Sequence, residues 1–112
     1  IQEEHFGATA IGNKIYVCGG RNRENKLSNE LKVFDCNSMK WTILSPMKYA
    51  RENFCITNLN GFIYVTVPDE TMIERYNITL DMWEEIEHQD IPKDIFHFFT
   101  FDNELYLIVI LI

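Results

Sequence analysis

The chain alternates short apolar runs with polar breaks, a pattern typical of β-strands rather than helices. Pairs of these runs are joined by the dipeptides Gly12-Asn13, Asn60-Gly61 and Asp102-Asn103. Gly, Asn and Asp tolerate the positive φ that a two-residue β-hairpin turn requires. We therefore expect the same hairpin design to occur three times along the chain.

Two further strands are expected after each of the first two hairpins, because a short alternating run and a run containing tryptophan follow there. Residues 21–29 are polar and charged without periodicity, which predicts a loop after the first hairpin. The expected strands are residues 6–11, 14–18, 30–35 and 41–44, then 54–59, 62–67, 72–76 and 83–86, then 96–101 and 105–110.

Aromatic residues recur at fixed offsets along these rounds. A phenylalanine stands ten residues before a tyrosine in all three rounds, and another aromatic residue stands seven before a tryptophan in the first two. The first round is six residues longer between its tyrosine and tryptophan, and the extra residues fall in the 21–29 loop, where insertion costs least. These aromatic residues are Phe6, Tyr16, Phe34, Trp41, Phe54, Tyr64, Tyr76, Trp83, Phe96 and Tyr106.

Four short strands repeated every 40 to 50 residues or so are typical of β-propeller blades. We therefore expect an all-β, partial propeller across residues 1–112, in which the recurring aromatic residues pack the antiparallel blades together. An aromatic ligand cage is the less favoured alternative. The expected division is a first blade at 1–48 (strands a to d), a second at 49–91 and the first half of a third at 92–112.

Both ends of the chain suggest a piece of a longer protein, because it begins at Ile1 and finishes in an apolar run from Leu105. About two and a half blades would not close a ring, since propellers usually have roughly four to eight. Unpaired strand edges favour association. We therefore expect the chain to be aggregation-prone by itself.

The formal net charge of -7, from 10 Lys and Arg against 17 Asp and Glu, disfavours a nucleic-acid or anionic-membrane partner. The terminal apolar run at 105–112 is much shorter than the about 20 residues that span a bilayer. Cys18, Cys36 and Cys55 are odd in number and form no CxxC motif, so we expect reduced thiols and neither a disulfide framework nor a zinc site. These features favour an intracellular, cytoplasmic protein.

The first round resembles the kelch repeat. The matching residues, in order, are Ile15-Tyr16-Val17-Cys18-Gly19-Gly20, Val33-Phe34-Asp35, Trp41, Pro46-Met47 and Arg51. The later rounds depart from the pattern, because Thr66-Val67 and Ile108-Val109 replace the pair Gly19-Gly20, which lets a strand end take positive φ. The resemblance covers almost the whole chain and implies a kelch-type β-propeller in which Gly19 and Gly20 contribute to blade packing.

Kelch propellers with this pattern are most often the substrate-binding half of BTB-kelch adaptors, which recruit targets to cullin-based ubiquitin ligases. The resemblance therefore implies a protein-binding module, with a cullin bound only through a BTB domain that this chain lacks. Alternatives within the same resemblance are a cytoskeletal, actin-binding scaffold and a non-functional kelch remnant. A copper radical oxidase is less favoured, because the three cysteines show no distinctive placement for one.

Catalytic chemistry has little support in the sequence. His5, His88 and His97 lie far apart, and Gly19-Gly20-Arg21 lacks the further glycines and the lysine of a phosphate-binding loop. We therefore expect no enzyme activity, no cofactor and no metal.

A partner-binding surface is expected at one end of the blades. When four antiparallel strands follow sequence order, the loop between the second and third strands and the connection to the next blade emerge at the same end. Arginine suits an acidic partner because its guanidinium pairs with a carboxylate in bidentate fashion. In related kelch adaptors, arginine and asparagine after the glycine pair and an arginine opening the first strand contact acidic peptides. The resulting candidates are Arg21, Asn22, Arg23, Lys26, Arg51 and Asn53. A solvated loop, with Glu24 and Glu52 diluting the positive field, is the alternative.

Overall fold

The computed structural model describes residues 6–50, 55–66, 72–87, 96–101 and 104–109 of the 112-residue chain. All regular secondary structure within these ranges is β-strand. The chain divides into two compact units, Ile1–Asn53 and Phe54–Ile112.

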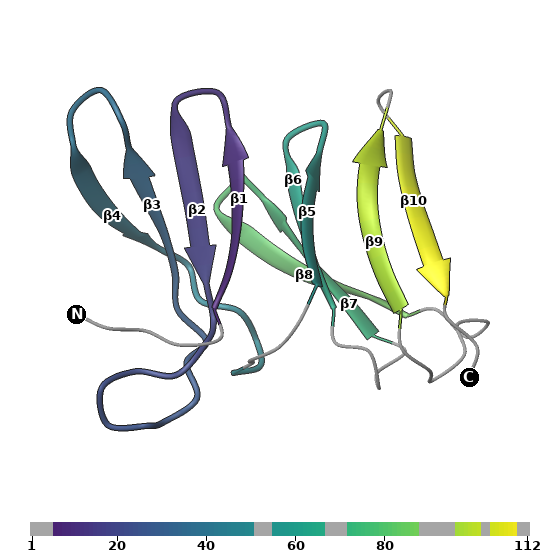
Figure 1. Ribbon diagram of the computed structural model, residues 1–112, viewed down its shortest axis with the longest axis horizontal. Helices are drawn as coiled ribbons and strands as arrows, with labels where there is room; N and C mark the ends of the chain where they lie inside the picture. Colours follow the sequence, from purple (N-terminus) through teal and green to yellow (C-terminus); the bar gives the residue numbers. More distant parts are fainter. Residues whose placement is uncertain (1–5, 51–54, 67–71, 88–95, 102–103, 110–112) are drawn as a thin grey trace. The chain divides into compact units, whose positions relative to one another are not determined.

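The first unit contains one four-stranded antiparallel sheet (Figure 1). Its strands lie in sequence order, so each strand pairs with the one before it in the chain. The strands are β1 (Gly7–Ile11), β2 (Lys14–Cys18), β3 (Leu31–Asp35) and β4 (Lys40–Leu44).

The second unit contains an equivalent four-stranded sheet and one hairpin (Figure 1). Its strands are β5 (Cys55–Leu59), β6 (Phe62–Thr66), β7 (Met72–Asn77) and β8 (Met82–Glu87), followed by β9 (Phe96–Phe101) and β10 (Glu104–Val109). The predicted all-β class and four-stranded blades of a partial propeller are therefore confirmed, and each strand ends within one residue of its predicted position. The blade limits at 48 and 91 stay predictions, because they fall in connections between strands and the strand positions do not define them.

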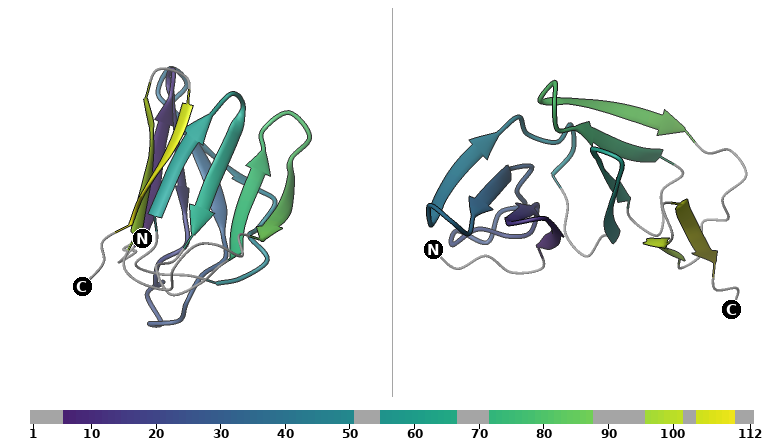
Figure 2. Two further views of the ribbon diagram at one scale, coloured as in Figure 1. Left: turned by 90° about the vertical axis from the view of Figure 1, so that its right-hand side faces the viewer. Right: turned by 90° about the horizontal axis from the view of Figure 1, so that it is seen from above.

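Both four-stranded sheets are twisted rather than flat, as Figure 2 shows. This twist follows from the handedness of L-amino-acid strands. It is the shape expected of a propeller blade.

The predicted two-residue turns close both hairpins, because Gly12-Asn13 and Asn60-Gly61 lie between paired strand ends. Gly12, Asn60 and Gly61 have φ values of 58°, 48° and 83°. A Cβ atom comes too close to the backbone carbonyl at such angles, so glycine is favoured and Asn is among the best tolerated other residues. The third predicted turn, 102–103, lies outside the described residues.

In each four-stranded sheet the two turns that lie at the same end are joined by a backbone hydrogen bond. In the first sheet the N–H of Cys36 donates to the carbonyl of Asn13 at 2.9 Å. The N–H of Ile78 donates to the carbonyl of Gly61 at 3.1 Å in the second sheet. The two sheets therefore share one turn arrangement.

Apart from Val17, the buried side chains of the first sheet's strands point to one face. Tyr16, Cys18 and Leu31 point to this face and are buried. Trp41 and Ile43 point to the opposite face and are 53% and 71% exposed.

The second sheet carries Ile63, Val65 and Tyr76 together on one face, and all three are buried. On its other face Ile73 packs against Tyr64. Alternation of the strands thus produces a core on both sides of this sheet.

The recurring aromatic residues form equivalent pairs within the two sheets. The ring centroids of Phe34 and Trp41 lie 5.0 Å apart, and those of Tyr76 and Trp83 lie 5.1 Å apart. Each pair stands directly opposite across two antiparallel strands, which explains the constant seven-residue offset. The fixed spacing therefore reflects a contact inside a sheet.

A packing role between blades stays a prediction for the whole aromatic set. Phe6 is 49% exposed, and Tyr64 is half-buried. Phe96 and Tyr106 lie on β9 and β10. Phe54 lies outside the described residues.

The turn between β3 and β4 depends on a side-chain cap. One carboxylate oxygen of Asp35 accepts hydrogen bonds from the backbone N–H groups of Asn37 at 2.8 Å and Ser38 at 3.1 Å. In the second sheet Asn77 takes the corresponding place and accepts from the N–H of Leu80 at 3.0 Å. The same cap is thus ionisable in one sheet and neutral in the other.

We predict that Asp35 makes the β3–β4 turn acid-sensitive. The N–H groups of Ser38 and Asn37 hold the pKa of Asp35 below its ordinary value. Stabilisation by this ionised carboxyl is therefore present above its unfolded-state pKa and is lost as the pH falls through its folded-state pKa. A carbon-13 NMR titration of the Asp35 carboxyl should show the lowered midpoint.

The control for this titration is Asp35→Asn, which keeps the acceptor, as Asn77 does, and removes the titration. The variant should keep its Asn37 and Ser38 amide signals unchanged in acid. A midpoint at the ordinary aspartate value would contradict the prediction.

Candidate functional site

The antiparallel order places two kinds of connection at opposite ends of the first sheet (Figure 1). The short turns join β1 to β2 and β3 to β4 at one end, called here the turn end. The β2–β3 loop, residues 19–30, and the β4 exit segment, residues 45–50, leave from the other, called the loop end. The predicted separation of short turns from long connections is therefore observed.

Two glycines start the β2–β3 loop with positive φ. Gly19 and Gly20 have φ values of 69° and 86° and are both buried. The N–H of Gly19 donates to the carbonyl of Glu30 at 3.1 Å, and the carbonyl of Gly20 accepts from the N–H of Ser28 at 2.8 Å. The glycine pair thus turns the chain while it remains hydrogen-bonded to the other side of the loop.

The side chain of Asn22 organises the tip of this loop. Its Oδ1 accepts hydrogen bonds from the backbone N–H groups of Glu24 at 2.9 Å and Lys26 at 3.1 Å. The backbone N–H of Asn22 donates to the carbonyl of Lys26 at 3.0 Å. The tip is therefore an Asx turn closed by its first residue.

Arg21 also serves the loop. Its Nη1 donates to the carbonyl of Asn25 at 2.8 Å, and its backbone forms a β-bridge with Leu27. Asn25 has a φ of 61°, so this contact holds a residue in the left-handed region. Arg21 and Asn22, both predicted to bind a partner, thus have structural contacts within the loop.

Arg23 and Lys26 are the exposed cations of the loop tip. The Nζ of Lys26 lies 3.7 Å from a carboxylate oxygen of Glu24, and both side chains are 74% exposed. An exposed ion pair of this kind contributes little to stability. Breaking the Lys26–Glu24 pair to bind a partner therefore costs little free energy, and Arg23 is exposed in the same loop tip.

The β4 exit segment is attached to the loop through Asn29, which the sequence analysis did not single out. The side-chain Nδ2 of Asn29 donates to the carbonyl of Met47 at 3.1 Å, and the N–H of Met47 donates to the carbonyl of Asn29 at 2.8 Å. Met47 is buried. No sequence signal could have paired the two residues, because they stand 18 positions apart in irregular connections.

The remaining predicted contact residues, Arg51 and Asn53, lie outside the described residues. The described part of the exit segment ends shortly before them and carries Lys48, whose Nζ lies 5.5 Å from the ring centroid of Tyr49. Tyr49 is 44% exposed. It was not predicted as a contact residue.

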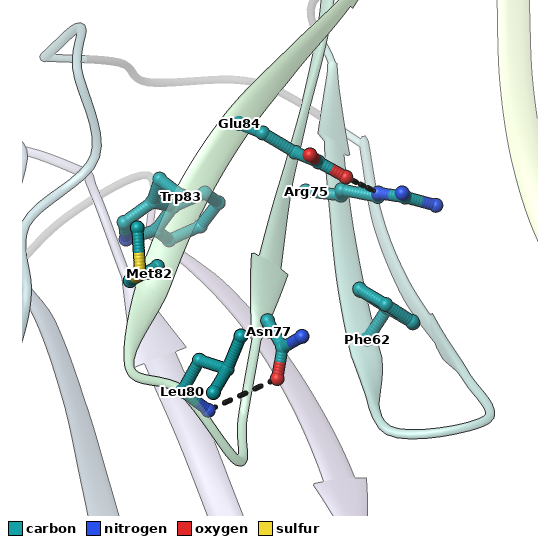
Figure 3. A pocket seen from close by; sticks show the side chains of 7 residues that line it. All are labelled: Phe62, Arg75, Asn77, Leu80, Met82, Trp83 and Glu84. Atoms are coloured by element: carbon teal, nitrogen blue, oxygen red, sulfur yellow. Dashed lines mark hydrogen bonds and ion pairs between the residues drawn. The ribbon is translucent and has the colours of Figure 1, made fainter.

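A hollow of about 220 Å³ lies on the second sheet, toward its turn end (Figure 3). The guanidinium of Arg75 lies 4.4 Å from the ring centroid of Phe62 and pairs with the Glu84 carboxylate. A hydrogen bond with Tyr64, opposed by burial and aided by Glu84, raises the pKa of Arg75 above its ordinary value. The hollow is lined by Phe62, Arg75, Asn77, Leu80, Met82, Trp83 and Glu84.

This hollow is less suited to an anionic ligand than the loop end of the first sheet. Its one cation already pairs with Glu84 and stacks on Phe62. A partner's carboxylate would have to displace a bound one. The exposed loop cations offer the better match for an acidic segment.

Other kinds of site receive no support from the described part of the chain. Within it, no cluster of three or more His, Cys, Asp or Glu side chains is arranged to hold a metal ion. None of its elements is a helix that could cross a membrane. Cys18 is buried and Cys36 exposed, and neither forms a disulfide bond there.

Comparison with known proteins places this arrangement among kelch repeats. Residues 5–48 match the kelch motif family. The chain is 35% identical over 96 residues to an F-box/kelch-repeat protein of Arabidopsis thaliana, a match that covers 79% of this chain and 25% of that protein.

Similar matches occur among animal proteins. The chain is 39% identical over 62 residues to Kelch-like protein 25 of Homo sapiens, covering 55% of this chain and 10% of that protein. It is 32% identical over 89 residues to Kelch-like protein 40 of Mus musculus, covering 73% and 14%. The chain therefore spans a quarter or less of the length of these relatives.

We predict that Asn22 orders the loop tip through its oxygen. Asn22→Ala removes the acceptor for the Glu24 and Lys26 amides, and these amides should exchange with solvent about fivefold to tenfold faster, as expected for the loss of a hydrogen bond. Hydrogen exchange followed by NMR measures this.

Asn22→Asp is the matched control, because a carboxylate can still accept both bonds. It should leave both exchange rates near those of the unmodified chain. Equal rates in Asn22→Ala and the unmodified chain would show that the side chain does not hold the tip.

Proposed function

Because this chain belongs to the kelch-repeat proteins, whose repeats form protein-interaction modules, we propose that it recognises an acidic segment of a protein partner through the loop end of its first sheet. The observation that carries the proposal is the exposure of Arg23 and Lys26 on a loop whose backbone is internally bonded. A preformed loop loses little conformational entropy on binding.

Local charge supports an acidic partner in spite of the overall charge of -7. The segment 21–26 carries Arg21, Arg23 and Lys26 against the single carboxylate of Glu24. A carboxylate-rich segment approaching this loop would gain charge-assisted hydrogen bonds from the exposed guanidinium and ammonium groups. The rest of the acidic chain would repel it and so orient its approach.

The predicted contact residues take two roles in this proposal. Arg23 and Lys26 contact the partner directly, whereas Arg21 and Asn22 shape the loop that presents them. Arg51 and Asn53 are proposed to extend the contact beyond the exit segment. No catalytic step and no cofactor is part of the proposed function.

We further propose that the partner is a substrate of a cullin-based ubiquitin ligase, recruited by a cytoplasmic adaptor that contains these repeats. Similarity to proteins named Kelch-like 25 and Kelch-like 40 supports this role. Contact with the cullin would be made by a BTB domain rather than by the blades.

We predict that neutralising the exposed loop cations weakens binding of an acidic probe. Arg23→Gln combined with Lys26→Gln should lower the affinity for a fluorescently labelled glutamate-rich peptide about tenfold, the equivalent of roughly 1.4 kcal/mol. Fluorescence anisotropy at low and at physiological salt measures the change. The unmodified chain should lose affinity as salt rises, and the variant less so.

The matched control removes the same charge from the turn end, through Lys14→Gln combined with Lys40→Gln. Both lysines are exposed and lie at the opposite end of the same sheet. This control should bind the probe like the unmodified chain. Equal weakening by both double variants would show that only the net charge matters, and it would overturn the proposed site.

We predict that a cullin co-purifies with the full-length protein that carries these repeats. Affinity capture from cells followed by mass spectrometry measures this, and Arg23→Gln with Lys26→Gln should retain the cullin while it loses the substrate. If the protein bound the acidic probe but captured no cullin, the ligase role would be overturned and the proposed binding site would stand.

A further inference from the structure

Asn29 makes a two-point connection between the two irregular segments at the loop end of the first sheet. Its Nδ2 donates to the carbonyl of Met47, and its own carbonyl accepts from the N–H of Met47, at 3.1 and 2.8 Å. Both backbone polar groups of Met47 are therefore used by one residue. Since the Met47 side chain is buried, the exit segment is anchored at this point.

The β2–β3 loop holds Asn29 from its own side. The N–H of Ser28 donates to the carbonyl of Gly20 at 2.8 Å, and the Ser28 hydroxyl accepts from the N–H of Glu30 at 3.1 Å. Asn29 thus stands between two residues with defined hydrogen bonds. Through its side-chain hydrogen bond, Asn29 fixes the position of Met47 relative to the loop.

Each segment presents a cation together with an apolar group. In the loop, the exposed Lys26 precedes Leu27, which is 43% exposed. In the exit segment, Lys48 lies over the ring of Tyr49, which is 44% exposed. An acidic segment that also carries an apolar side chain would suit both.

We propose that Asn29 is a positioning residue that joins the β2–β3 loop and the exit segment into one binding surface, on which Lys48 and Tyr49 form the second half. The partner is an acidic peptide segment that contains an apolar side chain. This inference rests on the proposed function, and it adds the exit segment and the residue that holds it in place.

The physical reason for such a connection is preorganisation. A partner that contacts two independent segments must order both when it binds, and each immobilised side chain lowers the affinity. The Asn29 to Met47 hydrogen bonds establish this order before binding. Loss of Asn29 should therefore affect the contribution of Tyr49 more than the contribution of Lys26.

The test uses two labelled peptides, a run of glutamates alone and the same run with one phenylalanine. Binding is measured for the unmodified chain, Asn29→Ala, Tyr49→Ala and the double variant. Asn29→Ala should weaken binding of the phenylalanine peptide about twofold to tenfold, as expected for one lost hydrogen bond. Tyr49→Ala should weaken it in the unmodified chain and have little further effect in Asn29→Ala.

Two controls separate positioning from a general loss of stability. Asn37→Ala removes an exposed asparagine from the turn end and should leave binding of both peptides unchanged. Lys26→Gln should weaken binding by the same factor with and without Asn29, because the loop tip is held by Asn22. A merely structural role of Asn29 would reduce the effects of Tyr49→Ala and Lys26→Gln alike and would overturn the inference.

Further outcomes distinguish this inference from the proposed function. An equal effect of Tyr49→Ala with and without Asn29, or no effect of Asn29→Ala, would overturn the inference and leave the proposed function intact. If the unmodified chain bound neither peptide, both would fail. If Asn29→Ala did not fold, Tyr49→Ala alone would decide, since an unchanged affinity for the phenylalanine peptide excludes a shared surface.

Discussion

Antiparallel pairing of consecutive strands is the constraint on which the rest of this molecule depends. Because consecutive strands β1 to β4 pair antiparallel, each connection begins and ends at the same end of the sheet, and successive connections alternate between the two ends. The β2–β3 loop and the exit from β4 consequently share one end. Residues far apart in sequence, such as Asn29 and Met47, therefore meet there.

Side chains in the loop show how a polar residue can be structural and still serve binding. A free loop of this length would lose much conformational entropy on contact with a partner. Asn22 and Arg21 form hydrogen bonds with backbone groups at the tip, so the loop loses this conformational entropy during folding and not on binding. The exposed Arg23 and Lys26 are then left to contribute electrostatic attraction.

The second sheet keeps the geometry of the first and changes its chemistry. Asn77 replaces Asp35 as the turn cap, and the buried Glu74 stands where Lys32 lies over the Trp41 ring. Backbone pairing tolerates these exchanges because it uses main-chain groups alone. A repeat can therefore keep one fold while each copy presents a different surface.

The strands, their order and the turn positions could be predicted from the sequence alone, because they follow from local alternation and from the φ that glycine and asparagine permit. It also placed Arg23 and Lys26 on an exposed loop. The folded structure was needed to show that Arg21 and Asn22 form hydrogen bonds within the loop and that Asn29 reaches Met47. The contact of Asn29 with Met47 depends on irregular backbone brought together by sheet pairing, for which neither periodicity nor spacing carries a signal. The bonds of Arg21 and Asn22 are local, but they form only in the particular backbone conformation that the loop adopts.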